Sequence, residues 1–133
     1  MITTEDMAQI IADHLKNSGG FAMPIYVKGH IPFKDIPDQG RITITPKEDS
    51  TGVIFNKCFC EVNFILPDVN QEANYKLDNI ERAAYELLKN GFAGSYEGQH
   101  YNVTYQRRSR EEDSQLKSHY VHIQLLFEIL NTL

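Results

Sequence analysis

The stretch VIFNKCFCEVNFILP, residues Val53 to Pro67, decides the fold of this chain. Every second residue from Ile54 to Leu66 is apolar except Asn56, whereas the residues between them are mixed in polarity. A period of two is typical of a β-strand that buries one face. Pro67 has no N–H to donate to a neighbouring strand, so it is expected to end the strand.

Two amphipathic helices are predicted on either side of this strand. The first begins at Thr3, where Asp6 completes a capping-box pattern, and ends at Gly19–Gly20. Its apolar stripe consists of Met7, Ile10, Ile11 and Leu15. The second runs from Tyr75 to Asn90, with Gly91 as its C-terminal stop. Its stripe consists of Leu77, Ile80, Ala84, Leu87 and Leu88, and both stripes are expected to face the sheet.

Further strands are predicted from β-branched and aromatic residues that alternate with polar ones. These segments are Phe21–Ile31, Arg41–Thr45, His100–Arg107 and Ser118–Leu130. Pro24 places the first of them at an edge of the sheet, or delays its start. Loops or turns are predicted where Pro, Gly or charged residues accumulate, at Pro32–Gly40, Pro46–Gly52, Gly91–Gly98 and Arg108–Lys117.

The predicted order of elements, α-β-β-β-α-β-β, indicates an α+β fold. We expect a two-layer sandwich, with both helices on one face of a four- to five-stranded, mainly antiparallel sheet. Residues 1–133 form a single domain by length. The strand Val53–Leu66 would be about 46 Å long at about 3.3 Å per residue, and the last strand is nearly as long. Such strands bend or project from the core, and projecting strands expose edges that assemblies use.

Composition and charge indicate a globular protein without a nucleic-acid or membrane role. The net charge is −5 and the pI about 5.5, which disfavours binding to nucleic acid or acidic lipid. No apolar run is long enough for a membrane helix, and the N-terminus lacks the pattern of a signal peptide. Cys58 and Cys60 lie on one face of a strand, which is poor geometry for a disulfide. A reduced, cytoplasmic origin is the simplest interpretation.

Candidate metal ligands are few, and each has a simpler interpretation. Cys58 and Cys60 form half of a metal-binding pattern, but no second cysteine pair exists, so core packing is favoured. His119 and His122 are three residues apart on a strand and therefore point to opposite faces. His100 is placed opposite His119 at the open end of the last hairpin. His14 is interpreted as a boundary residue of the first helix. We expect no bound metal or cofactor.

No catalytic residues are predicted either. The chain has no Gly-x-Ser-x-Gly elbow, and no cysteine is placed near a histidine at a strand end. Gly19–Gly20 follows a helix, whereas a phosphate-binding glycine loop opens one. Acidic residues are scattered, and nothing marks out one pair for acid–base catalysis.

The conspicuous polar feature is the segment Arg107–Asp113, in which three arginines precede three acids. Its charged residues are Arg107, Arg108, Arg110, Glu111, Glu112 and Asp113. One interpretation is a solvated hairpin tip. The other is an assembly contact, in which the basic half of one copy meets the acidic half of the next copy. Head-to-tail complementarity of this kind suits a ring.

The chain resembles the small tail-completion or tail-terminator proteins of tailed bacteriophages, which are related to minor tail and head–tail joining proteins. The resemblance covers nearly the whole chain and rests on ITTEDMAQIIADHL, CFCEVNFILP, LDNIERAAYELL, a polar hairpin and HYVHIQLLFEIL. The loop Pro32–Gly40 departs from it. The resemblance implies a two-layer α+β fold and ring-shaped oligomers, commonly hexamers, that cap the tail tube or join it to the neck, with no catalysis.

The resulting prediction is a structural protein of a phage or prophage tail. Its expected partners are copies of itself in a ring and other tail or neck proteins, and its location is the virion or the bacterial cytoplasm during assembly. Neither a membrane nor a specific nucleic acid is expected. The alternative is a small cytoplasmic ligand-binding or enzymatic domain with a pocket between the helices and the sheet. The absence of a convergent polar cluster in the sequence favours the first.

Overall fold

Helix α1, Thr4–Ser18, is fixed at both ends by local hydrogen bonds. The Thr3 side-chain oxygen accepts a hydrogen bond from the Asp6 backbone N–H (3.1 Å), and the Asp6 carboxylate accepts one from the Thr3 backbone N–H (2.9 Å). The predicted capping box is therefore confirmed. At the other end, the Gly19 N–H donates to the Leu15 carbonyl. The buried residues of α1 are Met7, Ala8, Ile10, Ile11, Ala12 and Leu15, which include the predicted stripe.

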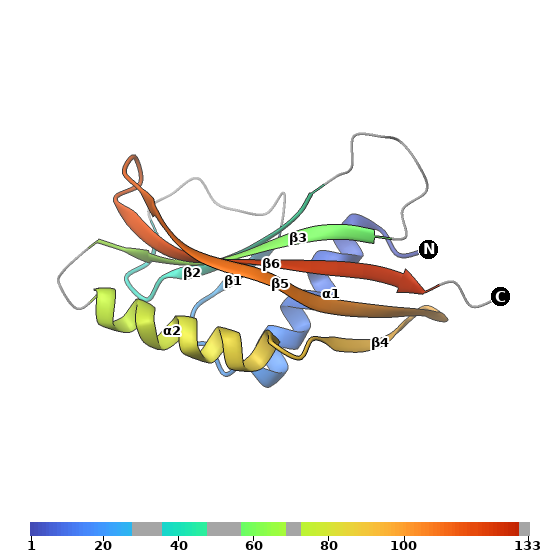
Figure 1. Cartoon of the computed structure of the whole chain (residues 1–133). Helices are drawn as coiled ribbons and strands as arrows, with labels where there is room; N and C mark the ends of the chain where they lie inside the picture. The colour runs from blue at the N-terminus through green and yellow to red at the C-terminus, as the bar shows by residue number, and fades with distance from the viewer. Residues whose placement is uncertain (28–35, 48–56, 69–72, 131–133) are drawn as a thin grey trace.

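The computed structural model describes residues 1–27, 36–47, 57–68 and 73–130. These residues form two helices and one six-stranded sheet (Figure 1). In spatial order the strands are β1 (Ile25–Val27), β2 (Arg41–Pro46), β3 (Lys57–Pro67), β6 (Ser118–Leu130), β5 (Gln99–Asp113) and β4 (Phe92–Tyr96). Strands β1 and β2 are parallel, and every other neighbouring pair is antiparallel. The predicted α+β class is confirmed.

Helix α2, Ala73–Leu88, is stopped by Gly91 as predicted, although its last helical residue is Leu88 instead of Asn90. Gly91 has a φ of +68°, in the left-handed region that glycine adopts readily, and its N–H donates to the Leu88 carbonyl. A Cβ at Gly91 would collide with the Val103 carbonyl oxygen, so the helix end lies directly against β5. In the predicted stripe, Leu77, Ala84 and Leu88 are buried, whereas Ile80 and Leu87 are partly buried against the core.

The two helices pack on one face of the sheet, which we call the helix face. The sheet curls around them. Helix α1 contacts β1 and β2, and α2 contacts β3 and β6. In β3 and β6 the side chains alternate between this buried face and the opposite, outer face. The buried apolar side chains of these two strands are Cys58, Cys60, Val62, Phe64, Leu66, Val121, Ile123, Leu125 and Phe127. The period-two pattern that predicted the central strand is therefore the pattern of the core.

Two predictions on the C-terminal half of the sheet are wrong. The segment Gly91–Gly98, predicted as a turn, contains β4, which pairs antiparallel with the first residues of β5. The segment Arg108–Lys117, predicted as a loop, belongs to β5 as far as Asp113, and the turn is confined to residues 114–117. Local composition misled in both places, because pairing with a long neighbouring strand overrides weak strand propensity.

Several predicted boundaries extend beyond the described residues. The first predicted strand is described as β1 up to Val27, and residues 28–31 lie outside the described part. Three other predicted segments also lie in part outside the described residues: Val53–Asn56 of the central strand, residues 32–35 of the first loop and residues 48–52 of the next loop. Pro46, predicted to open a turn, is the last residue of β2. The hairpin of β2 and β3 and the last strand, Ser118–Leu130, are confirmed. None of the described helices is long and apolar enough to span a membrane.

Candidate functional site

A β-bulge in β5 determines where the charged side chains of the chain point. Tyr105 pairs with Leu125 of β6, but the next paired residue is Arg107, opposite Gln124, so Gln106 is extra. Before the bulge, odd-numbered residues such as Val103 face the helices; after it, even-numbered residues do. Arg108 and Arg110, opposite Ile123 and Val121, therefore lie on the helix face, and Arg107 lies on the outer face. We call residues Arg107–Asp113 the charged arm.

Two arginines of the charged arm are bound to helix α2. The Arg110 guanidinium donates to the Glu81 carboxylate through Nε (2.9 Å) and to the Asp78 carboxylate through Nη2 (3.1 Å). The Arg108 Nε donates to the other oxygen of Glu81 (3.3 Å). These contacts link residues that lie about thirty positions apart, and they hold the arm against the helix.

Two tyrosines complete this junction. The Arg108 guanidinium lies 4.6 Å from the centre of the Tyr85 ring, and its Nη1 donates to the Tyr105 hydroxyl. The Tyr85 and Tyr105 rings pack edge to face at 5.5 Å. Hydrogen bonds with Tyr105 and Glu81 raise the pKa of Arg108. A cation over an aromatic face and a shared carboxylate make this an organised polar junction.

The six predicted interaction residues are thus brought onto one strand but do not act alike. Arg108 and Arg110 contact α2, whereas Arg107 has no ion-pair partner within the described part of the chain. Glu112 lies 4.0 Å from the Nε2 of His119 on β6. The carboxylate of Asp113 accepts hydrogen bonds from the backbone N–H groups of residues 115 and 116 and so shapes the turn.

Sequence reasoning missed the α2 half of the junction. Asp78, Glu81 and Tyr85 lie on one side of α2, at spacings of three and four residues. That spacing was a usable signal for a polar stripe. The sequence does not reveal the bulge at Gln106, however, and without it the arginines would have been assigned to the wrong face of the strand.

The outer edge of β5 is open beyond its first residues. Strand β4 pairs with Gln99–Val103 only, and none of the described residues pairs with the outer side of β5 from Thr104 to Asp113. The side chains from Gln106 to Glu112 are all exposed. In Figure 1 this part of the β5–β6 hairpin curls away from the body of the sheet. An open strand edge presents backbone N–H and C=O groups that another strand can bind.

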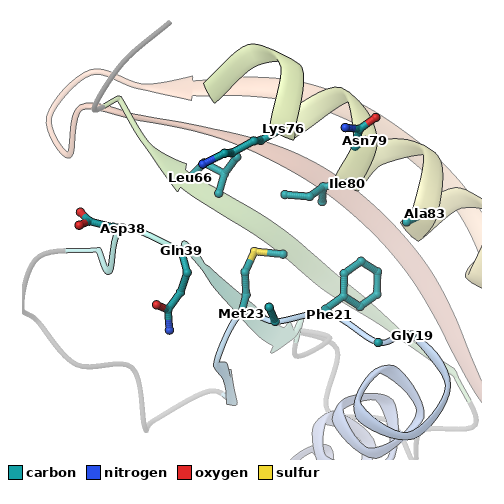
Figure 2. A pocket seen from close by; sticks show the side chains of 12 residues that line it. Gly19, Phe21, Met23, Asp38, Gln39, Leu66, Lys76, Asn79, Ile80 and Ala83 are labelled. Atoms are coloured by element: carbon teal, nitrogen blue, oxygen red, sulfur yellow. The ribbon is translucent and has the colours of Figure 1, made fainter. Parts of the chain in front are cut away.

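A second candidate site is a cleft of about 440 Å³ between the helices and the sheet. Figure 2 shows Phe21, Met23, Leu66 and Ile80 directed into it, with Lys76, Asp38 and Gln39 at its rim. The floor is apolar because Leu66 belongs to the helix face of β3. The cleft can accept an apolar group, and its described lining offers no cluster of catalytic side chains.

The two cysteines are core residues. Both are buried thiols on the helix face of β3, and the Cys58 Sγ donates to the Lys47 carbonyl (3.2 Å). A hydrogen bond with Cys58, together with burial, raises the pKa of Cys60, which keeps this thiol protonated and unreactive. The predicted packing role is consistent with this geometry.

The histidines occupy separate places, and one expectation about them is wrong. His100 pairs with Leu130, whereas His119 pairs with Glu112, so the two lie at opposite ends of the hairpin. His119 and His122 do face opposite sides, as predicted: the His119 Nδ1–H donates to the Asp68 carboxylate, and the His122 Nδ1–H donates to the Asn63 side-chain oxygen. Among the described residues, no three His, Cys, Asp or Glu side chains gather as metal ligands do.

His14 lies at the boundary between α1 and β4. Its ring stacks on Phe92 with 3.8 Å between the ring centres, and its Nε2 is buried without a hydrogen-bond partner among the residues that the structure describes. Burial lowers the pKa of His14. The predicted boundary role is consistent with these contacts, and the ring serves to dock β4 on the helix.

Comparisons with known proteins give the fold and no family. No family model matches the chain, and no curated protein matches it. A solved structure superposes with a TM-score of 0.54 over 93% of this chain and 95% of the other, at 15% sequence identity. The name of that protein states no activity or partner. At this identity the match supports the α+β architecture over the matched 93% of the chain and nothing further.

Proposed function

We propose that the chain is a structural protein of a phage or prophage tail, which assembles into an oligomeric ring that terminates the tail tube or joins it to the neck. The observation that carries the proposal is the open edge of β5 from Thr104 to Asp113. An open edge presents unpaired backbone groups with which a strand of another chain can pair, although charged side chains and a bulge, as in β5, limit indiscriminate pairing. The resemblance in sequence to tail-completion and tail-terminator proteins supplies the biological setting. No catalytic group, metal or cofactor is assigned.

The test is the mass of the purified full-length chain in solution. Light scattering after size exclusion should give a multiple of 15.3 kDa, and negative-stain microscopy should show closed rings. Ring closure requires head-to-tail contacts that repeat around an axis. A chain that remains monomeric from low to high micromolar concentration, without and with the other tail proteins of its source, would contradict the proposal.

A ligand-binding domain is the second candidate, and the cleft between the helices favours it. Its volume of about 440 Å³ and its apolar floor suit a small apolar ligand. Replacing Ala83 at its wall with Trp should fill the cleft. If the chain is a ligand-binding domain, apolar fragments that raise the melting temperature of the native protein should not raise that of Ala83→Trp. If the chain is an assembly protein, Ala83→Trp should have the same mass in solution as the native chain.

A further inference from the structure

The order of charges on the open edge of β5 indicates what binds there. Along the strand, Arg107, Arg108 and Arg110 come first, and Glu111, Glu112 and Asp113 follow. A parallel neighbour with the same sequence would put each charge beside its like. An antiparallel neighbour with the same sequence runs the order backwards, so arginines lie opposite acids. The edge is therefore complementary to a second copy of itself in one direction only.

The faces of the sheet and the charges together select one register for this pairing. In an antiparallel pair, residues directly opposite each other point to the same face. The two-fold axis must therefore pass between a residue and its own copy. With the axis at Arg110, Arg107 lies opposite Asp113 on the outer face, and Arg108 lies opposite Glu112 on the helix face. Each pair occurs twice by symmetry. Moving the axis by one residue leaves fewer arginines opposite acids.

Arg110, which lies on the two-fold axis, is compatible with this register. Two Arg110 side chains would meet there, but each is already bound to Asp78 and Glu81 of its own chain. Asp78 and Glu81 also pair with Arg82 and Arg108, so they offset part of the Arg110 charge before the copies meet. This compensation depends on the bulge, which directs Arg110 to the helix face.

The helices leave room for the second copy. Strands β6 of the two copies would be three strand spacings apart, about 14 Å, and packed helices need about 8–10 Å between axes. Helix α2 contacts β3 and β6, farther from the axis still. Beside the open edge lies a polar hollow of about 520 Å³, lined by Asp78, Glu81, Arg82, Tyr85, Glu86 and Arg108.

We propose that two copies of this chain join through their β5 edges, antiparallel and with Arg110 on the two-fold axis, to form one continuous sheet. The inference rests on the proposed assembly role and names the partner at its open edge. Alone, this contact gives a dimer of about twice 15.3 kDa. Because a two-fold contact closes on itself, a ring additionally requires a head-to-tail contact at another surface.

The first experiment changes single charges in the full chain and measures mass by light scattering. Arg107→Glu places an acid opposite Asp113 and should weaken self-association at least tenfold. Arg107 has no ion-pair partner within the described residues, so the melting temperature of the monomer should not change. Lys16→Glu makes the same change of charge on an exposed residue of α1, which packs on β1 and β2 at the other side of the sheet; it is the matched control and should keep the native mass.

The second experiment exchanges the two members of one pair. Arg108→Glu and Glu112→Arg each put like charges opposite one another, so each variant alone should dissociate. Mixed in equal amounts, they restore opposite charges at both copies of the pair and should form mixed dimers, seen by native mass spectrometry. Circular dichroism of each variant verifies that it is folded.

Covalent trapping tests the register independently of charge. Opposite residues of an antiparallel pair have Cβ atoms about 4.5–5.5 Å apart. Arg110→Cys should therefore form a disulfide-linked dimer under mild oxidation, while Ser95→Cys on β4, also exposed, should not. The native cysteines are buried and do not interfere.

The outcomes separate the two proposals. If the native chain is monomeric, both the assembly role and the edge pairing are wrong. If it forms only a dimer, which Arg107→Glu dissociates, the edge pairing stands and the ring is wrong. If the native chain assembles but Arg107→Glu, the exchanged pair and Arg110→Cys show no effect, the assembly role stands and the β5 pairing is wrong. A partner other than a second copy would appear as retained binding of another tail protein by a chain that does not self-associate, which also overturns the pairing.

Discussion

The two helices are held against the sheet in different ways. Helix α1 buries six residues and is closed by a capping box and by packing against β1 and β2. Helix α2 buries Leu77, Ala84 and Leu88 among its described side chains and, in addition, holds the charged arm of β5 through Asp78 and Glu81. Apolar burial fixes one helix, whereas the other also depends on charge. This difference means that α2 and the arm respond together to salt and to mutation.

The largest effect is expected when a fully buried leucine is removed from either helix. Leu15→Ala in α1 and Leu88→Ala in α2 should each lower the free energy of unfolding by about 2–5 kcal/mol, because both side chains are fully buried. Leu87, partly buried in the same turn of α2, is the matched control. Leu87→Ala should cost clearly less than Leu88→Ala in urea melts. Equal losses would show that the buried side of α2 is assigned wrongly.

The capping box of α1 should contribute an intermediate effect. Thr3→Ala removes the oxygen that accepts from the Asp6 N–H and should lower the free energy of unfolding by about 1 kcal/mol. Thr3→Ser keeps that oxygen and should restore most of the loss. Both variants are compared by chemical denaturation. A Thr3→Ala protein as stable as the native one would mean that the cap contributes nothing to α1.

A smaller effect is expected at the polar junction of α2. Glu81→Gln removes the charge that Arg108 and Arg110 share and should lower stability by about 0.5–1 kcal/mol at low salt. The loss should shrink in 0.5 M NaCl, since salt screens the interaction in the native protein. Glu86→Gln, which loses only a pair within α2, is the control and should have the smaller effect. A loss that is independent of salt would argue against an electrostatic junction.

The smallest effect concerns pH and the docking of β4 on α1. Burial lowers the pKa of His14 below its ordinary value of 6.5. Neutral His14 therefore makes its full contribution to the free energy of unfolding above about pH 6.5. This contribution is lost as the pH falls through the pKa of His14 in the folded protein. His14→Phe keeps an aromatic ring beside Phe92 and should flatten the dependence of stability on pH between 7 and 5. An unchanged pH profile would remove His14 as the responsible group.

The predictable part of this structure is the part that repeats locally. The capping box at Thr3, the apolar stripes and the period of two in β3 and β6 are each visible within about fifteen residues of sequence, and each is confirmed. Strand β4, with the sequence FAGSY, is stabilised mainly by its pairing with β5, and nothing in so short a segment indicates that pairing.

The candidate site was predictable in composition but not in geometry. The charged residues of the arm are conspicuous in the sequence, yet their assignment to a loop was wrong. One extra residue, Gln106, sets which arginines meet α2, and a bulge of this kind leaves no mark in composition. The hydrogen bond between Arg110 and Glu81 depends on this one extra residue and on the position of α2, which lies nearly thirty residues earlier in the sequence.

The bulge at Gln106 also divides β5 into two units of unequal local stability. Before it, His100–Val103 is paired with strands on both sides, so its amide hydrogens exchange with solvent only when β4 or β6 separates from it. After it, the backbone of the arm pairs with β6 alone, so the arm can open without disturbing the core once its side-chain contacts with Asp78 and Glu81 of α2 are broken. Strand β6 stays paired with β3 throughout such an opening. The arm can therefore fray and close again as a separate cooperative segment, while the rest of the sheet remains native.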